Sequence, residues 1–183
     1  MNAITHSAIV AGVAIFAGAL LLSLLLRRQA VPPLTQPISS YITGPYGWLT
    51  TAGFAGMFGA LWLLAYAEPG PLWTWTVPLF VSSVALAGVV ATKWGQLAVP
   101  TTSITHSDLE DLHILCAALA FGGVTVAELH STVGAGFTWA PWSAVILVLI
   151  FTFLKWSNTT LLEWSYTALI VTWFGCLLRY PIT

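Results

Sequence analysis

The feature that most constrains this chain is a long uncharged run inside a stretch rich in ionisable residues. Residues 112–127 contain no Asp, Glu, Lys or Arg, yet the surrounding stretch 105–131 holds four of the six carboxylates and three of the four histidines. At the helical rise these sixteen residues span roughly 24 Å, a little less than the ~30 Å hydrocarbon core of a bilayer. We therefore expect the ionisable groups at the two membrane interfaces, and we look there first for a functional site.

Composition places the whole chain in lipid. Only 6% of the residues are charged, against about 25% in a soluble domain, and the mean hydropathy is +0.89. The apolar runs are continuous, which favours helices over the alternating segments of a β-barrel. The fold class expected is an all-α, polytopic transmembrane bundle. A net charge of −1 with five Lys and Arg excludes nucleic acid as a partner, and Cys116 and Cys176 are expected to pack inside helices rather than to form a disulfide.

Six apolar segments predict six membrane spans within a single domain covering residues 1–183. Residues 29–46 contain four prolines and are expected to form an interfacial loop that cannot bury itself. Residues 93–107 are polar and are expected to form a second loop, and Pro78 is expected to kink the start of the third span. The spans are predicted at about residues 8–26, 47–67, 72–91, 109–129, 139–154 and 161–178.

The second predicted span carries a stripe of small residues. Ala52, Gly56 and Ala60 follow one another at intervals of four, with Gly53 and Gly59 beside them. Because there is little hydrophobic drive between helices in lipid, such a stripe allows two backbones to approach closely. We expect this span near the centre of the bundle.

Basic residues set the expected orientation, since acidic residues contribute little to it. Arg27, Arg28, Lys93 and Lys155 fall in the odd-numbered loops, whereas Arg179 falls on the opposite face. The odd loops are therefore predicted to face the cytoplasm. Both termini are predicted to lie outside, with the protein in the cell's inner membrane.

The acidic residues at the inner end allow two interpretations. Glu110 and His113 are three residues apart and share a helix face, whereas Asp111 and His113 do not. One interpretation is helix capping, with Ser107 or Asp108 as the N-cap and acids in the first turn. The other is catalysis: His113 enters the apolar run, where an ionisable residue is a functional hypothesis by default, and it would serve as a general base.

No cofactor is predicted. His113 and His130 lie roughly 25 Å apart on one helix, which suggests two haems, but only His6 is placed to be a second ligand for His130. A divalent metal is disfavoured because the polar residues match no recognised ligand spacing. The metal ligands considered are His106, Asp108, Glu110 and His113.

The segment of residues 36–49, QPISSYITGPYGWL, followed by a glycine-rich span, resembles the opening motif of the bacterial membrane family called domain of unknown function 998. His113, Ala117 and Phe121 form an H-xxx-A-xxx-F pattern that resembles the histidine-bearing helix of that family and, more loosely, of Frag/DRAM-like six-span proteins. The resemblance implies a six-helix bundle without an assigned reaction. We interpret the first six of the positions matched below as an interfacial re-entry that docks loop one onto the bundle. The matched positions are Tyr41, Gly44, Pro45, Tyr46, Gly47, Trp48 and His113.

These patterns predict a small integral membrane protein that binds lipid or a lipophilic ligand, or that packs as an accessory subunit against a larger membrane complex. Membrane lipids and other membrane protein subunits are the expected partners. The alternative is a membrane-embedded enzyme acting on a lipid at the cytoplasmic interface. Its catalytic candidates are His113, Glu110 and Asp111. The ligand-binding candidates are Tyr41, Tyr46, Trp48, His113, Glu128 and His130.

Overall fold

The computed structural model describes residues 3–27, 36–67, 72–130 and 159–179. Between its turns this part of the chain is helical, and it contains no strand. Two short helices, η1 (Ile38–Ile42, a 3-10 helix) and η2 (Leu72–Thr76, a π-helix), accompany the long ones. The long helices are α1 (Ala3–Arg27), α2 (Gly47–Ala67), α3 (Val77–Ala98), α4 (Ile104–His130) and α6 (Thr159–Arg179).

The all-α prediction is confirmed for the described residues, but the count of six spans is not established. The predicted sixth span, 161–178, falls within α6, and the predicted fifth, 139–154, lies outside the described residues. Four helical stretches are long and apolar enough to cross a membrane. They are Ala3–Leu26, Gly47–Ala67, Leu72–Ala98 and Ile104–Leu129.

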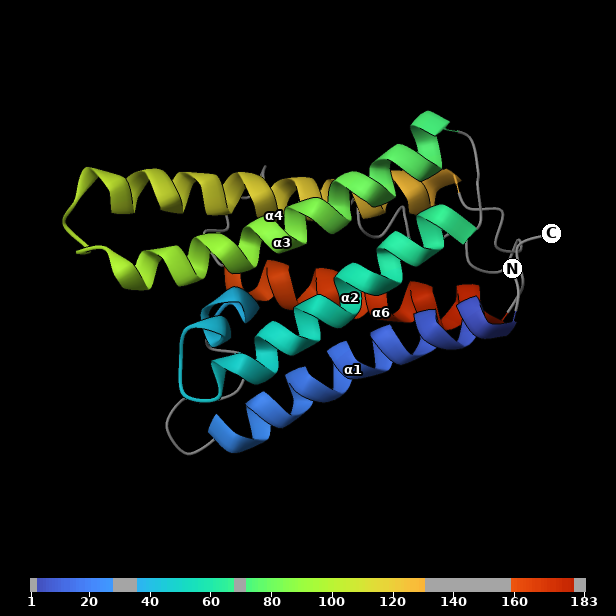
Figure 1. Cartoon of the computed structure of the whole chain (residues 1–183), viewed down its shortest axis with the longest axis horizontal. Helices are drawn as coiled ribbons and strands as arrows, with labels where there is room; N and C mark the ends of the chain where they lie inside the picture. The colour runs from blue at the N-terminus through green and yellow to red at the C-terminus, as the bar shows by residue number, and fades with distance from the viewer. Residues whose placement is uncertain (1–2, 28–35, 68–71, 131–158, 180–183) are drawn as a thin grey trace.

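Consecutive helices pack side by side. α1 lies along α2, α2 along α3 and α3 along α4, each antiparallel to the one before it (Figure 1). As a result, the end of α1, the start of α2, the end of α3 and the start of α4 lie at the same end of the bundle. We call this the η1 end, because η1 also lies there (Figure 1).

The contact between α1 and α2 is close enough to exclude side chains. A Cβ added to Gly12 would lie 2.6 Å from the carbonyl oxygen of Gly56, and one added to Gly56 would lie 2.7 Å from that of Gly12. Gly53 and Ala60 also face α1, so the predicted small-residue contact is confirmed at these positions. Ala52 is exposed instead. Four residues make one full turn of the helix plus about 40°, so Ala52 does not lie on quite the same face as Gly56.

The turn between α3 and α4 is much shorter than expected. α3 continues to Ala98 and α4 begins at Ile104, so the prediction of a loop over residues 93–107 is wrong for all but 99–103. Lys93 donates a hydrogen bond to Gln96 within the last turns of α3 (3.2 Å), which lets these polar residues remain helical. The backbone N–H of His106 donates to the hydroxyl of Ser103 (3.0 Å). Ser103 therefore caps α4, and the prediction of Ser107 or Asp108 as N-cap is wrong.

The start of the third apolar segment is irregular, as Pro78 predicts. The π-helical turn η2 precedes α3, and Pro78 stands in the first turn of α3, where a missing N–H is tolerated. On the facing helix, Gly123 lies against the carbonyl of Pro78 and the hydroxyl of Ser82. The glycine allows α4 to pack directly on the backbone of α3.

Part of loop one is buried, contrary to the expectation for residues 29–46. In η1, Ile38 and Tyr41 are each 2% exposed, and Ile42 is fully buried. A Cβ on Gly47 would overlap the carbonyl of Ile42, so a glycine is required where α2 begins. Because η1 docks against α2, α3 and α6, loop one supplies a wall of the bundle interior.

Candidate functional site

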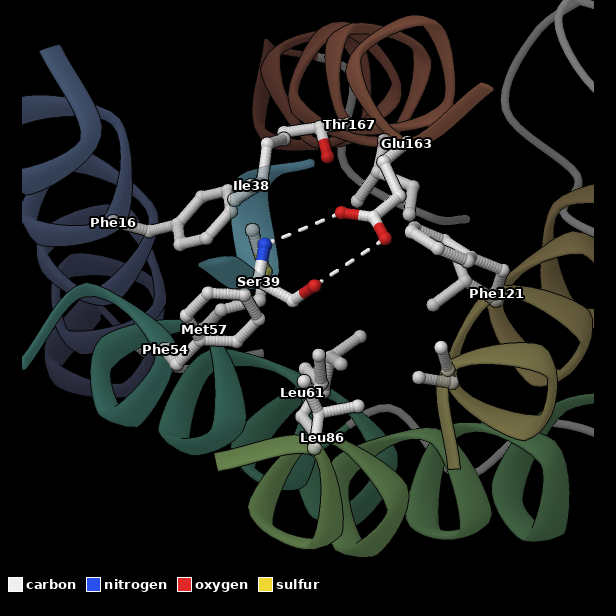
Figure 2. A pocket seen from close by; sticks show the side chains of 15 residues that line it. Phe16, Ile38, Ser39, Phe54, Met57, Leu61, Leu86, Phe121, Glu163 and Thr167 are labelled. Atoms are coloured by element: carbon white, nitrogen blue, oxygen red, sulfur yellow. Dashed lines mark hydrogen bonds between the residues drawn. The ribbon is translucent and has the colours of Figure 1, made fainter. Parts of the chain in front are cut away.

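A cavity lies at the centre of the bundle, where α1, η1, α2, α3, α4 and α6 converge (Figure 2). Of the fifteen residues that line it, twelve are apolar, and Ser39, Glu163 and Thr167 are the polar ones. Its volume is about 50 Å³. A single buried water needs roughly 10–15 Å³, so the cavity can hold part of a larger molecule.

The polar wall of the cavity is the contact between Ser39 and Glu163. The backbone N–H of Ser39 donates to Oε2 of Glu163 (3.2 Å), and the Ser39 hydroxyl donates to Oε1 (3.4 Å). Figure 2 shows the Glu163 carboxylate reaching from α6 towards Ser39 on η1. Beside it, the indole N–H of Trp164 donates to the carbonyl of Gln36 (3.1 Å). These contacts fix loop one to α6.

Glu163 is a site residue that the sequence reasoning missed. It lies in the second turn of α6, within the predicted sixth span, and a carboxylate in such a position is rare unless it has a function or a partner. That signal was present in the sequence. What could not be predicted was its partner, because Ser39 is 124 residues away.

The H-xxx-A-xxx-F pattern of α4 faces the bundle interior. Ala117 and Phe121 line the cavity, together with Ala120 and Val124. His113 is one turn before Ala117 on the same helix and is only 6% exposed. This histidine therefore borders the cavity residues without lining the cavity itself.

His113 bonds to α3 rather than to its acidic neighbours. Its Nδ1 lies 3.0 Å from Oγ1 of Thr92, and the Thr92 hydroxyl lies 2.8 Å from the carbonyl of Gly88. Since that hydroxyl has one proton and a carbonyl can only accept, the geometry favours Nδ1–H of His113 as donor to Thr92. Glu110 and Asp111 are both exposed. The structure does not bring the three catalytic candidates together.

The aromatic ligand-binding candidates do not form one site. Tyr41 is buried in η1 and packs edge-on against Trp164, with ring centroids 6.3 Å apart. Tyr46 and Trp48 are 47% and 65% exposed. Of the three, Tyr41 alone takes part in the predicted docking of loop one.

Glu128 lies towards the other end of α4. It is 2% exposed, and no hydrogen-bond partner of its Oε1 is found among the described residues. One turn earlier, the hydroxyls of Thr125 and Tyr166 are 2.6 Å apart and join α4 to α6. His130 follows in the last turn of α4, and its side chain lies outside the described part. In that part, no group of three or more His, Cys, Asp or Glu side chains could hold a metal ion.

Side-chain hydrogen bonds join neighbouring helices at the η1 end of the bundle. One such bond joins α1 to α2, one joins α2 to α3 and one joins α3 to α4. The two residues used on α2 are adjacent in sequence and the two used on α3 are two apart, so the three bonds form one polar layer. Interhelical bonds of this kind contribute about 0.6–2 kcal/mol each in membrane proteins. The pairs are Ser23 with Thr50, Thr51 with Trp94 and Thr92 with His113.

Comparisons with protein-family models, with curated proteins and with solved structures found no match to this chain. The function is therefore argued from the geometry of the cavity and its polar wall.

Proposed function

We propose that this chain is an integral membrane protein that holds a lipophilic ligand in the cavity at the centre of its bundle. The observation that carries the proposal is the lining: twelve apolar side chains from every long helix described and from η1, and one carboxylate, Glu163, on the wall. Ligand sites in proteins are mostly apolar with a few polar groups that fix orientation, and they commonly lie between helices of a bundle.

The same proposal includes six spans and a location in the inner membrane. Support for an additional crossing is that α4 ends and α6 begins at opposite ends of the bundle (Figure 1). Support for the orientation is that α1, whose last residue is Arg27, and α3, whose last turns include Lys93, both end at the η1 end (Figure 1). A shared location of basic residues is what the positive-inside rule requires.

A second candidate function is that of an accessory subunit. Gly18 and Gly59 would meet nothing within 4 Å if a Cβ were added, so these glycines face outward. Large aromatic side chains are also exposed nearby in sequence: Trp62 and Tyr66 on α2, and Trp73 on η2. Small outward residues allow another helix to approach closely in lipid. This observation favours a protein partner on the outer surface, separate from the cavity.

The arrangement of the three catalytic candidates does not favour the enzyme alternative. A general base at His113 would need Glu110 or Asp111 as an orienting acid. Since His113 is buried against Thr92 while both acids are exposed, we do not propose it.

Copurification tests the leading proposal. The tagged protein is extracted in mild detergent, and bound lipophiles are measured by native mass spectrometry and by organic extraction. Ala120→Leu fills the cavity, because Ala120 lines it, whereas Ala118→Leu makes the same change on an exposed face of α4. We expect a bound lipophile in the wild type and in Ala118→Leu and its loss in Ala120→Leu. A wild type without any lipophile, or equal loading of the two variants, would contradict the proposal.

A further inference from the structure

We propose that the ligand is a single-chain lipophile with a hydroxyl or amino group, which binds Glu163 while the chain runs past Phe16 into a groove between α1 and α6. This inference rests on the proposed function and names the class of molecule that the cavity takes.

The polar group of the ligand follows from the chemistry of Glu163. Among the described residues that line the cavity, Glu163 is the only ionisable one. A carboxylate accepts hydrogen bonds at about four lone-pair positions; Ser39 uses one on each oxygen, and the backbone N–H of Ile38 uses a third. An acceptor position remains for a donor from the ligand. A ligand carboxylate or phosphate would bring a second negative charge into an apolar space, where charges interact strongly.

The path of the chain follows from the continuity of two hollows. A groove on the outside of the bundle is lined by residues 16–24 of α1 and 164–172 of α6, and Phe16 and Thr167 line both this groove and the cavity. The groove measures about 370 Å³. Along α6 it extends for roughly 12 Å at the helical rise. A chain can therefore continue from the small cavity into the larger groove.

The helices beside this groove are loosely joined. α1 contacts α6 over far fewer residues than it contacts α2, where Gly12 and Gly56 meet backbone to backbone. Phe16 separates the groove from the cavity and packs edge-on against Phe54, with ring centroids 5.7 Å apart. Because the Phe16 side chain lines both spaces, the proposed path requires its ring to rotate so that the cavity and the groove join.

A second groove, between α2 and α3, also borders the cavity. It measures about 300 Å³ and shares Phe54 and Leu86 with the cavity wall. We favour the α1–α6 groove because Glu163 and Thr167 lie one turn apart on α6, which places the polar group and the first part of the chain on the same helix. No residue of α6 lines the α2–α3 groove.

The first experiment tests the polar group. Full-length protein in lipid nanodiscs is titrated with dodecylamine, dodecanol and laurate, and dissociation constants are measured by competition with a bound fluorescent lipophile. We expect the amine and the alcohol to bind at least about tenfold more tightly than laurate, and Glu163→Gln to reduce amine affinity about tenfold while leaving the alcohol within about threefold. Equal binding of laurate and dodecylamine to the wild type would overturn the inference while leaving the proposed function intact. If the fluorescent lipophile binds but none of the three competes with it, the inference is overturned and the proposed function stands, whereas binding of neither the fluorescent lipophile nor any of the three would overturn both.

A control separates ligand contact from the docking of loop one. Ser39→Ala removes one hydrogen bond to Glu163 but keeps the carboxylate. If the variant loses as much amine affinity as Glu163→Gln, Glu163 acts only by holding η1, and the inference is wrong. We expect less than about threefold loss, since the variant keeps the carboxylate and the hydrogen bond that it accepts from the backbone N–H of residue 39.

The second experiment tests the path of the chain with three matched variants at exposed alanines. Ala17→Phe fills the α1–α6 groove, Ala87→Phe fills the α2–α3 groove, and Ala14→Phe lies one turn before Ala17 and lines neither groove. We expect dodecylamine affinity to fall at least about tenfold in Ala17→Phe alone. A loss confined to Ala87→Phe would place the chain in the other groove, and equal affinity in all three would exclude both grooves.

Discussion

Nδ1 of His113 lies 3.0 Å from the hydroxyl of Thr92, and both side chains are buried between α3 and α4. The residue that looks most like a catalyst in the sequence is therefore a link between two membrane helices. Its position one turn from the cavity explains how a single helix face can combine a structural histidine with the cavity-lining residues Ala117 and Phe121.

Replacing His113 with alanine is expected to lower the free energy of unfolding by about 2–3 kcal/mol, because a buried hydrogen bond is lost and a void is left. Glu110→Ala, on an exposed position of the same helix, is expected to change it by less than about 0.5 kcal/mol. Reversible unfolding in mixed micelles measures both. A His113→Ala variant of unchanged stability that lost a lipid-modifying activity would instead support the general-base role.

The two glycines of α2 should respond in opposite directions to the same substitution. Gly56→Ala places a methyl group against the backbone of Gly12 and is expected to cost about 1–3 kcal/mol of stability. Gly59→Ala meets nothing within 4 Å and should be neutral or stabilising by up to about 1 kcal/mol, since alanine is the better helix former. The same unfolding assay compares them, and similar effects would argue against the close α1–α2 contact.

The hydrogen bond between Thr125 and Tyr166 predicts an energetic coupling between α4 and α6. In a double-mutant cycle of Thr125→Val and Tyr166→Phe, we expect a coupling energy of about 0.6 kcal/mol, the average for such bonds between membrane helices, and at most about 1.7 kcal/mol. A value near zero would mean that the hydroxyls do not interact in the membrane. The corresponding cycle of Ser23→Ala and Thr50→Val provides a comparison between α1 and α2.

The proposed orientation predicts the side of the membrane on which reporter proteins fused to the chain are active. Reporter proteins fused after residue 28 and after residue 100 should both be active in the cytoplasm, because α1 ends, and the turn from α3 to α4 lies, at the same η1 end of the bundle (Figure 1). A reporter before residue 3 should be active only outside. If the fusions at residues 28 and 100 report opposite compartments, the proposed arrangement of α1 to α3 in the membrane is wrong.

The parts of the fold that the sequence predicts are those set by local pattern. Long apolar runs predict helices, and the Gly56 stripe predicts a close contact, because both depend on residues within a few turns of each other. The extent of α3 beyond Lys93 was not predictable from polarity alone, since polar side chains at a helix end reach water without ending the helix. Neither was the partner of Glu163, which depends on how distant segments meet.

Ser39 and Glu163 are 124 residues apart, and this separation has a consequence for biogenesis. α1 to α4 form hairpins between neighbours and can associate while the ribosome is still synthesising the rest. Glu163 cannot hold loop one until α6 has been synthesised. The wall of the central cavity is therefore completed at a late stage of synthesis, after α1 to α4 have been made.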